Sequence, residues 1–458
     1  MSRNIEIAPS GIYLSEGQNV YPAYFLPGVK ESELEVRTEK FENKYGKLEV
    51  EIPRLKTSLI KNTLNALDYS RKGYLNDKST SEILDIAYKN IKLWSDPNYR
   101  FREAAEKWMP ISMGFSPEMS RKVLDETMAS FTRDLYKIPL TEKNNGIEKI
   151  FCIPPEVPGP DVLSIIKGLL NKSSVFCKSS VGNVFSSLYA QSYLDVDKEI
   201  AGCIAVAPWK GGKLESVDVE NLIYGERNKK DAIVIFGKPK TEEAIREKAR
   251  HDTNIISYTR GISFGVIGKE MLTRDKIDDL ALEAALAVCM ADQRDCFSSQ
   301  SYYVERGGEI SPEEFSEMLA KKMQDLEFKM PRGELSLDAS ANFTEHMTSY
   351  ELLDLTGNLK LYEIRRGKTQ TGAVIYREDK EFQPSPLYRV ITVKPVDDVS
   401  EVPKLVESFS EFLHTVGVAL PENKKKGLGS ELKKFGVSRI TSINKMYKPS
   451  ILEYELFA

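Results

Sequence analysis

The sequence is poor in the residues that build metal centres and disulfide frameworks. It has five cysteines and three histidines in 458 residues, with neither a C-x-x-C nor an H-x-x-x-H spacing. This pattern excludes zinc ribbons, disulfide-stapled domains and histidine-rich metal sites, and we expect no metal. An enzyme of this composition would work through a single cysteine or through carboxylates, together with an organic cofactor.

An excess of charge of one sign is also missing. The chain has 64 lysines and arginines against 68 aspartates and glutamates, a net charge of −4, which provides no bulk attraction to nucleic acid or to an anionic membrane. Uncharged apolar runs of about 18 residues do not occur, and the start, MSRNIEIAPSGIYL, lacks the layout of a secretory signal. We expect a cytoplasmic protein that neither spans a membrane nor binds nucleic acid.

The rhythm of apolar residues divides the chain into four regions. Residues 1–147 read mainly as helices that pack on the next region, 148–258, in which short apolar strands alternate with helices. That alternation predicts an α/β fold with a doubly wound parallel sheet, an arrangement that often binds a dinucleotide cofactor. We expect a second, catalytic α/β domain at 259–420 and a tail at 421–458 that packs back. Within the tail, the basic cluster 424–434 is interpreted as a solvated loop.

Helical and strand spacing locates the individual elements. Apolar residues that return every three or four positions predict helices at 58–69, 81–93, 116–135 and 275–290. Short apolar runs predict parallel strands at 149–154, 174–178, 202–207, 232–236 and 255–258. In a doubly wound sheet the ligand binds beyond the carboxyl ends of such strands.

Two of these strand ends carry residues suited to phosphate and ribose. Lys178, Ser179 and Ser180 follow one strand, and Gly237 and Lys238 follow another. A G-x-G-x-x-G fingerprint is missing, so each cluster alone also fits an ordinary loop at the end of a strand. Lysines facing a ribose would suit the 2′-phosphate of NADPH.

The cysteines fall into two groups. Four lie in apolar strand or helix patterns, where a small buried side chain is the simplest interpretation: Cys152, Cys177, Cys203 and Cys289. Cys296 instead follows a helix among charged and small polar residues. A nearby cation such as Arg294 could favour its reactive thiolate form. No histidine is placed against Cys296 by the sequence, which argues against a papain-like hydrolase.

The segment around Cys296 resembles a known family. ADQRDCFSSQ resembles the cysteine segment of LuxC-type acyl-CoA reductases, the fatty acid reductases of bacterial luminescence systems, in the aldehyde dehydrogenase superfamily. The family pattern D-Q-x-x-C-x-S-x-Q matches Asp292, Gln293, Cys296, Ser298 and Gln300. Further family-like segments occur in the family's order: MGFSPEMSRKVL, GLLNKSSVFCKSS, GISFGVIG, FLHTVGVAL and GVSRITSINKM.

The resemblance implies an aldehyde-dehydrogenase-like fold and the NADPH-dependent reduction of a long-chain acyl thioester to a fatty aldehyde. Cys296 would carry the acyl group as a thioester, delivered by acyl-CoA or by an acyl-protein. Lys178, Ser179 and Ser180 would contact the adenosine ribose, and Gly237 with Lys238 would form the phosphate-side loop. The superfamily also implies a homo-oligomer, and the family an acyl-protein synthetase as a candidate partner.

The sequence departs from the superfamily at two positions. The glutamate base that activates water in hydrolytic members is replaced by Tyr258 in YTRGISF, which suits a reductase that must not hydrolyse its thioester. The usual oxyanion asparagine is replaced by Glu156 in PPEVP. A good oxyanion donor is worth roughly 3–4 kcal/mol, and a carboxylate there would repel the developing charge.

Two alternatives remain open. Glu156 fits a catalytically weakened scaffold that binds an acyl-protein synthetase. An acyltransferase or thioesterase, in which Cys296 passes the acyl group to an amine or to water, also fits a lone reactive cysteine. Asp292 and Gln293 are expected to shape the loop and not to transfer protons.

Overall fold

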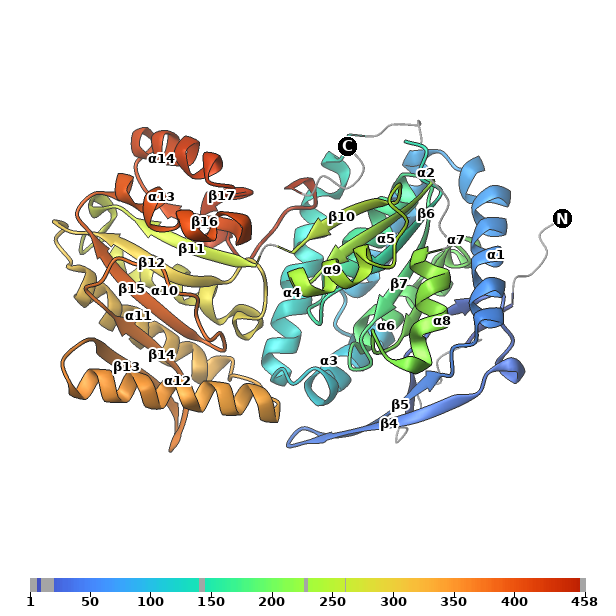
Figure 1. Cartoon of the computed structure of the whole chain (residues 1–458), viewed down its shortest axis with the longest axis horizontal. Coiled ribbons are helices and arrows are strands. Elements are labelled where there is room, and N and C mark those ends of the chain that lie inside the picture. The colour runs from blue at the N-terminus through green and yellow to red at the C-terminus, as the bar shows by residue number, and fades with distance from the viewer. Residues whose placement is uncertain (1–5, 10–19, 140–144, 226–229, 260, 454–458) are drawn as a thin grey trace. The chain divides into compact units, whose positions relative to one another are not determined.

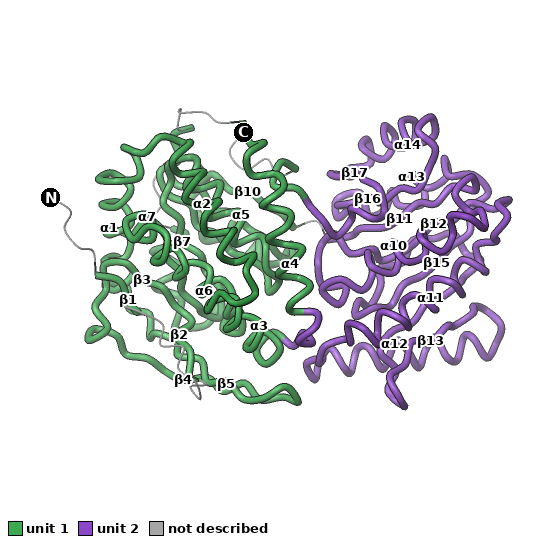
Figure 2. The backbone as a smooth tube through the Cα atoms, turned by 180° about the vertical axis from the view of Figure 1, so that it is seen from behind, with its two compact units in different colours: residues 1–113, 120–259, 450–458 green, residues 114–119, 260–449 purple. Residues whose placement is uncertain are grey.

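The chain forms two compact units, seen in the computed structural model of Figure 1 and coloured separately in Figure 2. The structure describes residues 6–9, 20–139, 145–225, 230–259 and 261–453. Unit 1 comprises residues 1–113, 120–259 and 450–458, and unit 2 comprises 114–119 and 260–449. The predicted divisions at 147/148 and 420/421 therefore fall inside units.

Unit 1 is built on the predicted doubly wound sheet. Its five strands are all parallel and lie in the order β10-β9-β6-β7-β8. Their bounds are Lys149–Ile153 (β6), Ser174–Ser179 (β7), Ile204–Pro208 (β8), Asp231–Phe236 (β9) and Asn254–Tyr258 (β10). β6 is the first strand of this sheet along the chain. The next strands, β7 and β8, are added on one side of it, and β9 and β10 are added on the other side. The strand order therefore reverses between β6 and β9, where dinucleotide-binding folds place their ligand. The predicted α/β class is confirmed.

Helices cover this sheet and bury its apolar side chains. Leu59, Ile60 and Leu67 of the first helix pack with Phe151 of β6 and Phe176 of β7 in one core cluster. The helices are α1 (Thr57–Gly73), α2 (Thr80–Trp94), α3 (Arg100–Ser112), α4 (Pro117–Asp134), α5 (Pro160–Leu170), α6 (Val184–Ser192) and α9 (Pro239–Arg246). The region predicted as mainly helical also contains a small sheet, whose strands are β2 (Val20–Pro22), β4 (Val36–Asn43) and β5 (Gly46–Pro53).

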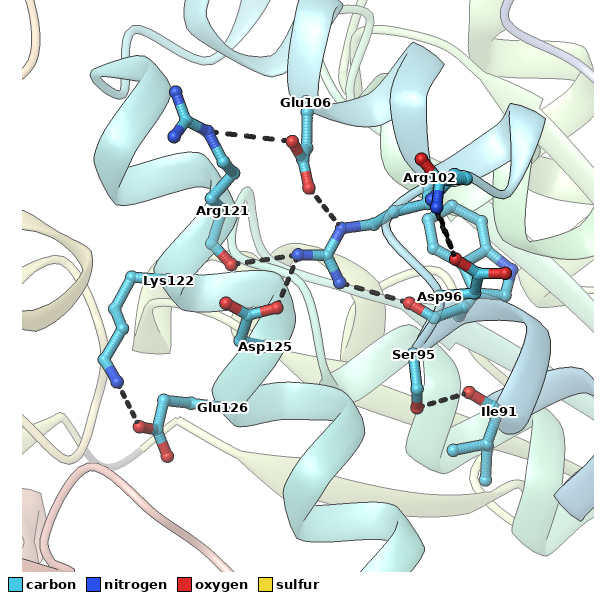
Figure 3. A network of polar contacts seen from close by, with 11 residues as sticks. Ile91, Ser95, Asp96, Arg102, Glu106, Arg121, Lys122, Asp125 and Glu126 are labelled. Carbon is cyan, nitrogen blue, oxygen red and sulfur yellow. Dashed lines mark hydrogen bonds and ion pairs between the residues drawn. The ribbon is translucent and has the colours of Figure 1, made fainter.

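A buried arginine joins α2, α3 and α4 (Figure 3). Arg102 is only 2% exposed, and its guanidinium donates to Glu106 at 2.6 Å and to Asp125 at 2.7 Å. It also donates to the carbonyl oxygens of Trp94 and Arg121, at 3.1 and 3.2 Å. Two carboxylates and two carbonyls offset the cost of burying the cation.

Unit 2 contains the second predicted α/β sheet. Its seven strands lie in the order β13-β14-β15-β12-β11-β16-β17, and only the β13/β14 pair is antiparallel. The bounds are Ile262–Ile267 (β11), Ser299–Glu305 (β12), Lys360–Arg366 (β13), Thr369–Tyr376 (β14), Val390–Val396 (β15), Leu413–Ala419 (β16) and Arg439–Ser442 (β17). The helices are α10 (Ile277–Cys289), α11 (Pro312–Lys329), α12 (Leu337–Leu355), α13 (Val402–Leu405) and α14 (Glu422–Lys434). The predicted apolar stripe of α10 is buried.

One prediction about local structure is wrong. The basic cluster 424–434 is not a loop but most of helix α14. Leu428 and Leu432 are four residues apart, so they lie on one face of the helix, and both are buried in the core of unit 2. Two apolar residues at helical spacing outweigh a run of lysines, because the lysines can remain in solvent on the other face.

No described helix is long and apolar enough to cross a membrane. Among the same residues there is no group of three or more His, Cys, Asp or Glu side chains that could hold a metal ion.

Candidate active site

Cys296 lies on a loop between α10 and the central strand β12. The helix ends at Cys289, a short turn covers Met290–Gln293, and the strand begins at Ser299. Cys296 is partly exposed, whereas the other four cysteines are buried. The interpretation of those four as packing residues is confirmed, and Cys296 is the cysteine whose residue is partly exposed.

The peptide of Cys296 is tied to two neighbouring strands. The hydroxyl of Ser263, in β11, donates to the carbonyl oxygen of Cys296 at 2.6 Å and accepts the N–H of Thr415, in β16, at 3.0 Å. Ser263 and Thr415 are both fully buried. The thiol therefore projects from a backbone whose position is fixed by the sheet.

The thiol of Cys296 has a raised pKa. Burial is the largest cause, and the adjacent carboxylate of Asp295, which also hydrogen-bonds the thiol, adds to it. The guanidinium of Arg439 opposes the rise. Burial likewise raises the pKa of Asp295, against hydrogen bonds from the N–H of Phe297 and from the thiol. Each of the two groups therefore holds its own proton more strongly than it would in water.

The expectation that Arg294 favours the thiolate stays a prediction. Its guanidinium lies over the ring of Phe115, 4.5 Å from the centroid, and a second cation, Arg439, lowers the pKa of the Cys296 thiol. Arg439 lies over the ring of Phe297 at 5.4 Å and donates to the carbonyl oxygens of Met446 and Lys445 at 2.9 and 2.8 Å. Spacing along the chain suggested the nearer arginine, and the fold brings a distant one to the loop.

The other residues of the predicted cysteine pattern hold the loop. Gln300 donates to the carbonyl oxygen of Gly261 at 2.8 Å and accepts the N–H of Ser385 at 3.3 Å. Asp292 and Gln293 are 2% and 1% exposed, and their hydrogen bonds go to the protein. Their side chains lie within unit 2 together with Cys296.

The predicted cofactor residues gather in unit 1, at the carboxyl end of β7. The ammonium of Lys178 lies over the ring of Trp209, 5.7 Å from its centroid. Burial lowers the pKa of Lys178, and the carboxylates of Glu220 and Glu156 oppose that change. The Ser179 hydroxyl is fully buried, and neither it nor the Ser180 hydroxyl has a hydrogen-bond partner among the described residues. Buried polar atoms without a protein partner fit a site for a polar ligand such as a ribose.

Trp209 follows β8 and is itself held in place. Its indole N–H donates to Glu220 at 3.1 Å, and the same carboxylate accepts the N–H of Gly212 at 3.1 Å and pairs with Lys248. Glu220 is 2% exposed. The ring beneath Lys178 is therefore held in a fixed position, and no spacing in the sequence predicts it.

Gly237 and Lys238 lie just after β9, the strand that flanks β6 on the side opposite β7. Gly237 follows β9, and Lys238 is the residue before α9, which begins with Pro239. Both residues are exposed. They join Lys178 at the same edge of the sheet, because the carboxyl ends of parallel strands share one edge.

Comparison with known proteins places this chain in a family. A family model described as "Acyl-CoA reductase (LuxC)" matches residues 143–450. The chain belongs to the LuxC acyl-CoA reductase family. This confirms the resemblance read from the Cys296 segment and identifies the protein as an acyl reductase, an oxidoreductase.

Two relatives carry the name "Long-chain acyl-protein thioester reductase". The protein of Photobacterium phosphoreum is 22% identical over 358 residues, which cover 73% of this chain and 69% of the relative. The protein of Aliivibrio fischeri is 24% identical over 385 residues, which cover 76% and 74%. Both alignments extend over most of each chain.

The solved structures that this LuxC-family chain resembles are aldehyde dehydrogenases. A salicylaldehyde dehydrogenase from Pseudomonas putida G7, complexed with salicylaldehyde, superposes with a TM-score of 0.69 at 14% identity and covers 93% of this chain and 90% of its own. An NADP-dependent glyceraldehyde-3-phosphate dehydrogenase from Bacillus halodurans C-125, complexed with NADP, gives 0.66 at 14%, covering 89% and 87%. The predicted aldehyde-dehydrogenase-like fold is confirmed.

Glu156 lies on the loop after β6 in this family member. Its residue is exposed, and the preceding Pro155 has its carbonyl oxygen bound by Asn183 at 3.1 Å. Its charge acts on Lys178 of the neighbouring strand. Its effect on an oxyanion stays a prediction.

Three residues close to Cys296 were not predicted from the sequence. Asp295, Arg439 and His414 all lie in its surroundings: the ring of His414 is 5.0 Å from that of Phe297, and its Nδ1 is 2.9 Å from the Thr415 hydroxyl. His414 and Arg439 occur in FLHTVGVAL and GVSRITSINKM, so the family segments contained the signal. Only the sheet, which pairs β16 with β17, shows why these segments belong together.

Proposed function

We propose that this protein reduces a long-chain fatty acyl thioester to a fatty aldehyde with NADPH, through an S-acyl intermediate on Cys296. The observation that carries the proposal is the position of Cys296. It is the partly exposed cysteine of five, on a loop fixed to the catalytic sheet, within a chain of the LuxC family. A thiol is the best nucleophile among protein side chains for accepting an acyl group.

Asp295 takes the thiol proton in the proposed first step. Because both pKa values are raised, little free thiolate is present, and proton transfer accompanies attack. The Cys296 sulfur forms a bond to the acyl carbon, the bond from that carbon to the donor sulfur breaks, and the departing thiolate takes the proton from Asp295. The backbone N–H of Cys296 is the proposed donor to the oxyanion.

NADPH, when bound, supplies the hydride that reduces the acyl-enzyme thioester. Ser179 and Ser180 would hold the adenosine ribose through their unpartnered hydroxyls, and Lys178 would pair with the 2′-phosphate. Gly237 and Lys238 would receive the phosphates at the edge where β9 ends.

Tyr258 supports reduction over hydrolysis. It ends β10, with its ring stacked on Phe236 at 4.8 Å, and it supplies no carboxylate at the position expected for a water-activating base. An S-acyl enzyme without such a base survives long enough to be reduced.

An acyl-protein is the proposed physiological donor, with acyl-CoA accepted as a simpler thioester. The names of the two relatives support the protein thioester. An acyl-protein synthetase would then be the partner that delivers the acyl group. We propose a homo-oligomer as the working form, as expected from the superfamily.

The test is NADPH oxidation with tetradecanoyl-CoA, followed at 340 nm, with aldehyde captured as a hydrazone. The proposal predicts stoichiometric aldehyde, and loss of both signals in Cys296→Ala. Normal NADPH oxidation by that variant would overturn the assignment. Release of free fatty acid without NADPH would favour the thioesterase, and cofactor binding without turnover would favour the scaffold.

A further inference from the structure

Two stretches of left-handed backbone lie beside the nucleophile. Ala291, Asp292 and Gln293 have φ of 50°, 52° and 62°, and residues 387–389 have φ of 70°, 57° and 68°. None of the six is glycine. Runs of three such residues are sterically disfavoured and persist only where other interactions hold them.

Arg389 joins the two stretches. Its Nε and Nη2 lie 2.9 and 2.7 Å from Asp292 Oδ1, and its Nη1 lies 2.9 Å from Glu327 Oε2, in α11. Arg389, Asp292 and Glu327 are 1%, 2% and 0% exposed. The other Asp292 oxygen accepts the N–H of Gly333 at 3.1 Å. Asp292 is thus held from two directions, three residues before Asp295.

Gln293 makes the second connection, to the start of β15. Its side-chain amide donates to the carbonyl oxygens of Ser299 and Val390 at 2.7 and 2.9 Å, and its Oε1 accepts the Val390 N–H at 3.0 Å. Gly372, in β14, makes room for the second stretch, because a Cβ there would lie 2.6 Å from the Arg389 carbonyl oxygen. The two stretches are therefore joined by side-chain hydrogen bonds and hold each other in place.

We propose that Arg389 is a positioning residue that acts through Asp292 to hold the Cys296 loop in the geometry needed for acyl transfer. The role in acyl transfer rests on the proposed function, whereas the effect on the thiol does not. Displacement of a reacting atom by about 1 Å costs roughly 100-fold in rate. An arginine suits the task because its planar fork presents separate N–H donors to the two carboxylates in a fixed geometry, whereas the ammonium of a lysine is a single point charge.

The first test is Arg389→Lys, which keeps the charge. We expect kcat for acyl-thioester reduction to fall about 100-fold with KM for NADPH unchanged, and the rate of Cys296 alkylation by iodoacetamide to change at each pH. Arg102→Lys is the matched control, because Arg102 is also buried between two carboxylates. It should lower the denaturation midpoint while kcat and Cys296 alkylation stay at their wild-type values.

The second test separates positioning from a purely structural role. Asp292→Asn should lower kcat about as much as Arg389→Lys, whereas Glu327→Gln should lower stability and retain most of the kcat, because it leaves the Asp292 pair intact. These two variants carry the test if Arg389→Lys does not fold. Equal kcat losses in both, or no loss in Asp292→Asn, would overturn the proposal.

The alkylation assay separates failure of this inference from failure of the proposed function. A wild-type protein that reduces no thioester, but whose Cys296 alkylation depends on Arg389, would refute the proposed function and keep the positioning role. A wild-type protein that reduces thioesters, and whose kcat and alkylation rate survive Arg389→Lys, would refute the positioning role alone.

Discussion

The sheets of the two units present their candidate site residues at opposite ends of their strands. In unit 1, Lys178 and Ser179 complete β7 at its carboxyl end. In unit 2, Cys296 comes just before β12 begins, at its amino end. At the carboxyl end of β7, the hydroxyl of Ser179 has no partner among the described residues, as expected of a surface that binds a ligand. Around Cys296, the side chains of Ser263, Gln293 and Gln300 are already bonded to the protein.

The region around Lys178 has polar groups that are available to a ligand, whereas the loop of Cys296 is held in one position by hydrogen bonds within the protein. Helices follow strands at the carboxyl end of a parallel sheet, and their first N–H groups are free to bind a ligand. The amino ends of the strands are not followed by helix N-termini with free N–H groups, so a loop there must be held by side chains. Substitutions near Cys296 should therefore change rate and stability, and those near Lys178 should change cofactor affinity.

Among the variants that distinguish the two regions, Asp295→Asn is expected to have the largest effect on a rate. Acyl transfer to Cys296 should slow about 100-fold, because the thiol proton has lost its acceptor. Alkylation of Cys296 by iodoacetamide at neutral pH should become faster, since removing the carboxylate removes one cause of the raised thiol pKa. Both rates can be followed by mass spectrometry.

The control for this variant is Asp325→Asn, at an exposed position of α11, which should change neither rate. A loss of both rates in Asp295→Asn would show that the carboxylate only supports the loop. A gain in both would show that it is not the proton acceptor.

A smaller change, in affinity and not in rate, is expected for Lys178→Met. The KM for NADPH should rise about 10-fold to 100-fold with kcat retained, because one charge-assisted contact is worth roughly 1.5–3 kcal/mol. The KM for NADH should change less, since NADH lacks the 2′-phosphate. Lys240→Met, exposed on α9, is the control. A fall in kcat at constant KM would mean that Lys178 belongs with the fixed residues of unit 2.

A pair of serine variants compares the two regions directly. Ser263→Ala should lower the free energy of unfolding by about 1–3 kcal/mol, because it leaves the Thr415 N–H and the Cys296 carbonyl without a partner. Ser179→Ala should leave that free energy nearly unchanged and weaken NADPH binding, because its hydroxyl has no described protein partner. Urea unfolding and fluorescence titration with NADPH measure the two effects. Equal losses in the free energy of unfolding for the two variants would contradict the proposed difference between the two regions.

The smallest effect is expected in the pH profile of the thiol. Because the pKa of Cys296 in the folded protein lies well above the ordinary value of a cysteine, its alkylation rate should still be rising where that of a free thiol has levelled off. Below that range the thiol stays protonated and slow. Alkylation rates measured in quenched samples between pH 6 and about 10 would show this continued rise. A plateau of the rate near neutral pH would contradict the raised pKa of the thiol.

The sequence predicts the scaffold better than the surroundings of Cys296. Periodicity locates β6 to β10 and α10, because buried strands and amphipathic helices leave a pattern in neighbouring residues. The cysteine pattern identifies Cys296 and the residues beside it. Arg389, Arg439 and His414 have no such pattern, since each reaches the loop through sheet pairing between segments about 90 or more residues apart in the chain. The left-handed backbone at 291–293 carries no glycine that would reveal it.

Intact-protein and peptide mass spectrometry show directly whether Cys296 itself carries the acyl group. The protein is mixed with a long-chain acyl-CoA in the absence of NADPH, quenched in acid and digested. The account predicts one acyl group on the peptide that contains Cys296, and its removal when NADPH is added, with aldehyde released in equal amount. Acylation at any other residue, or aldehyde formed without acylation of Cys296, would contradict it.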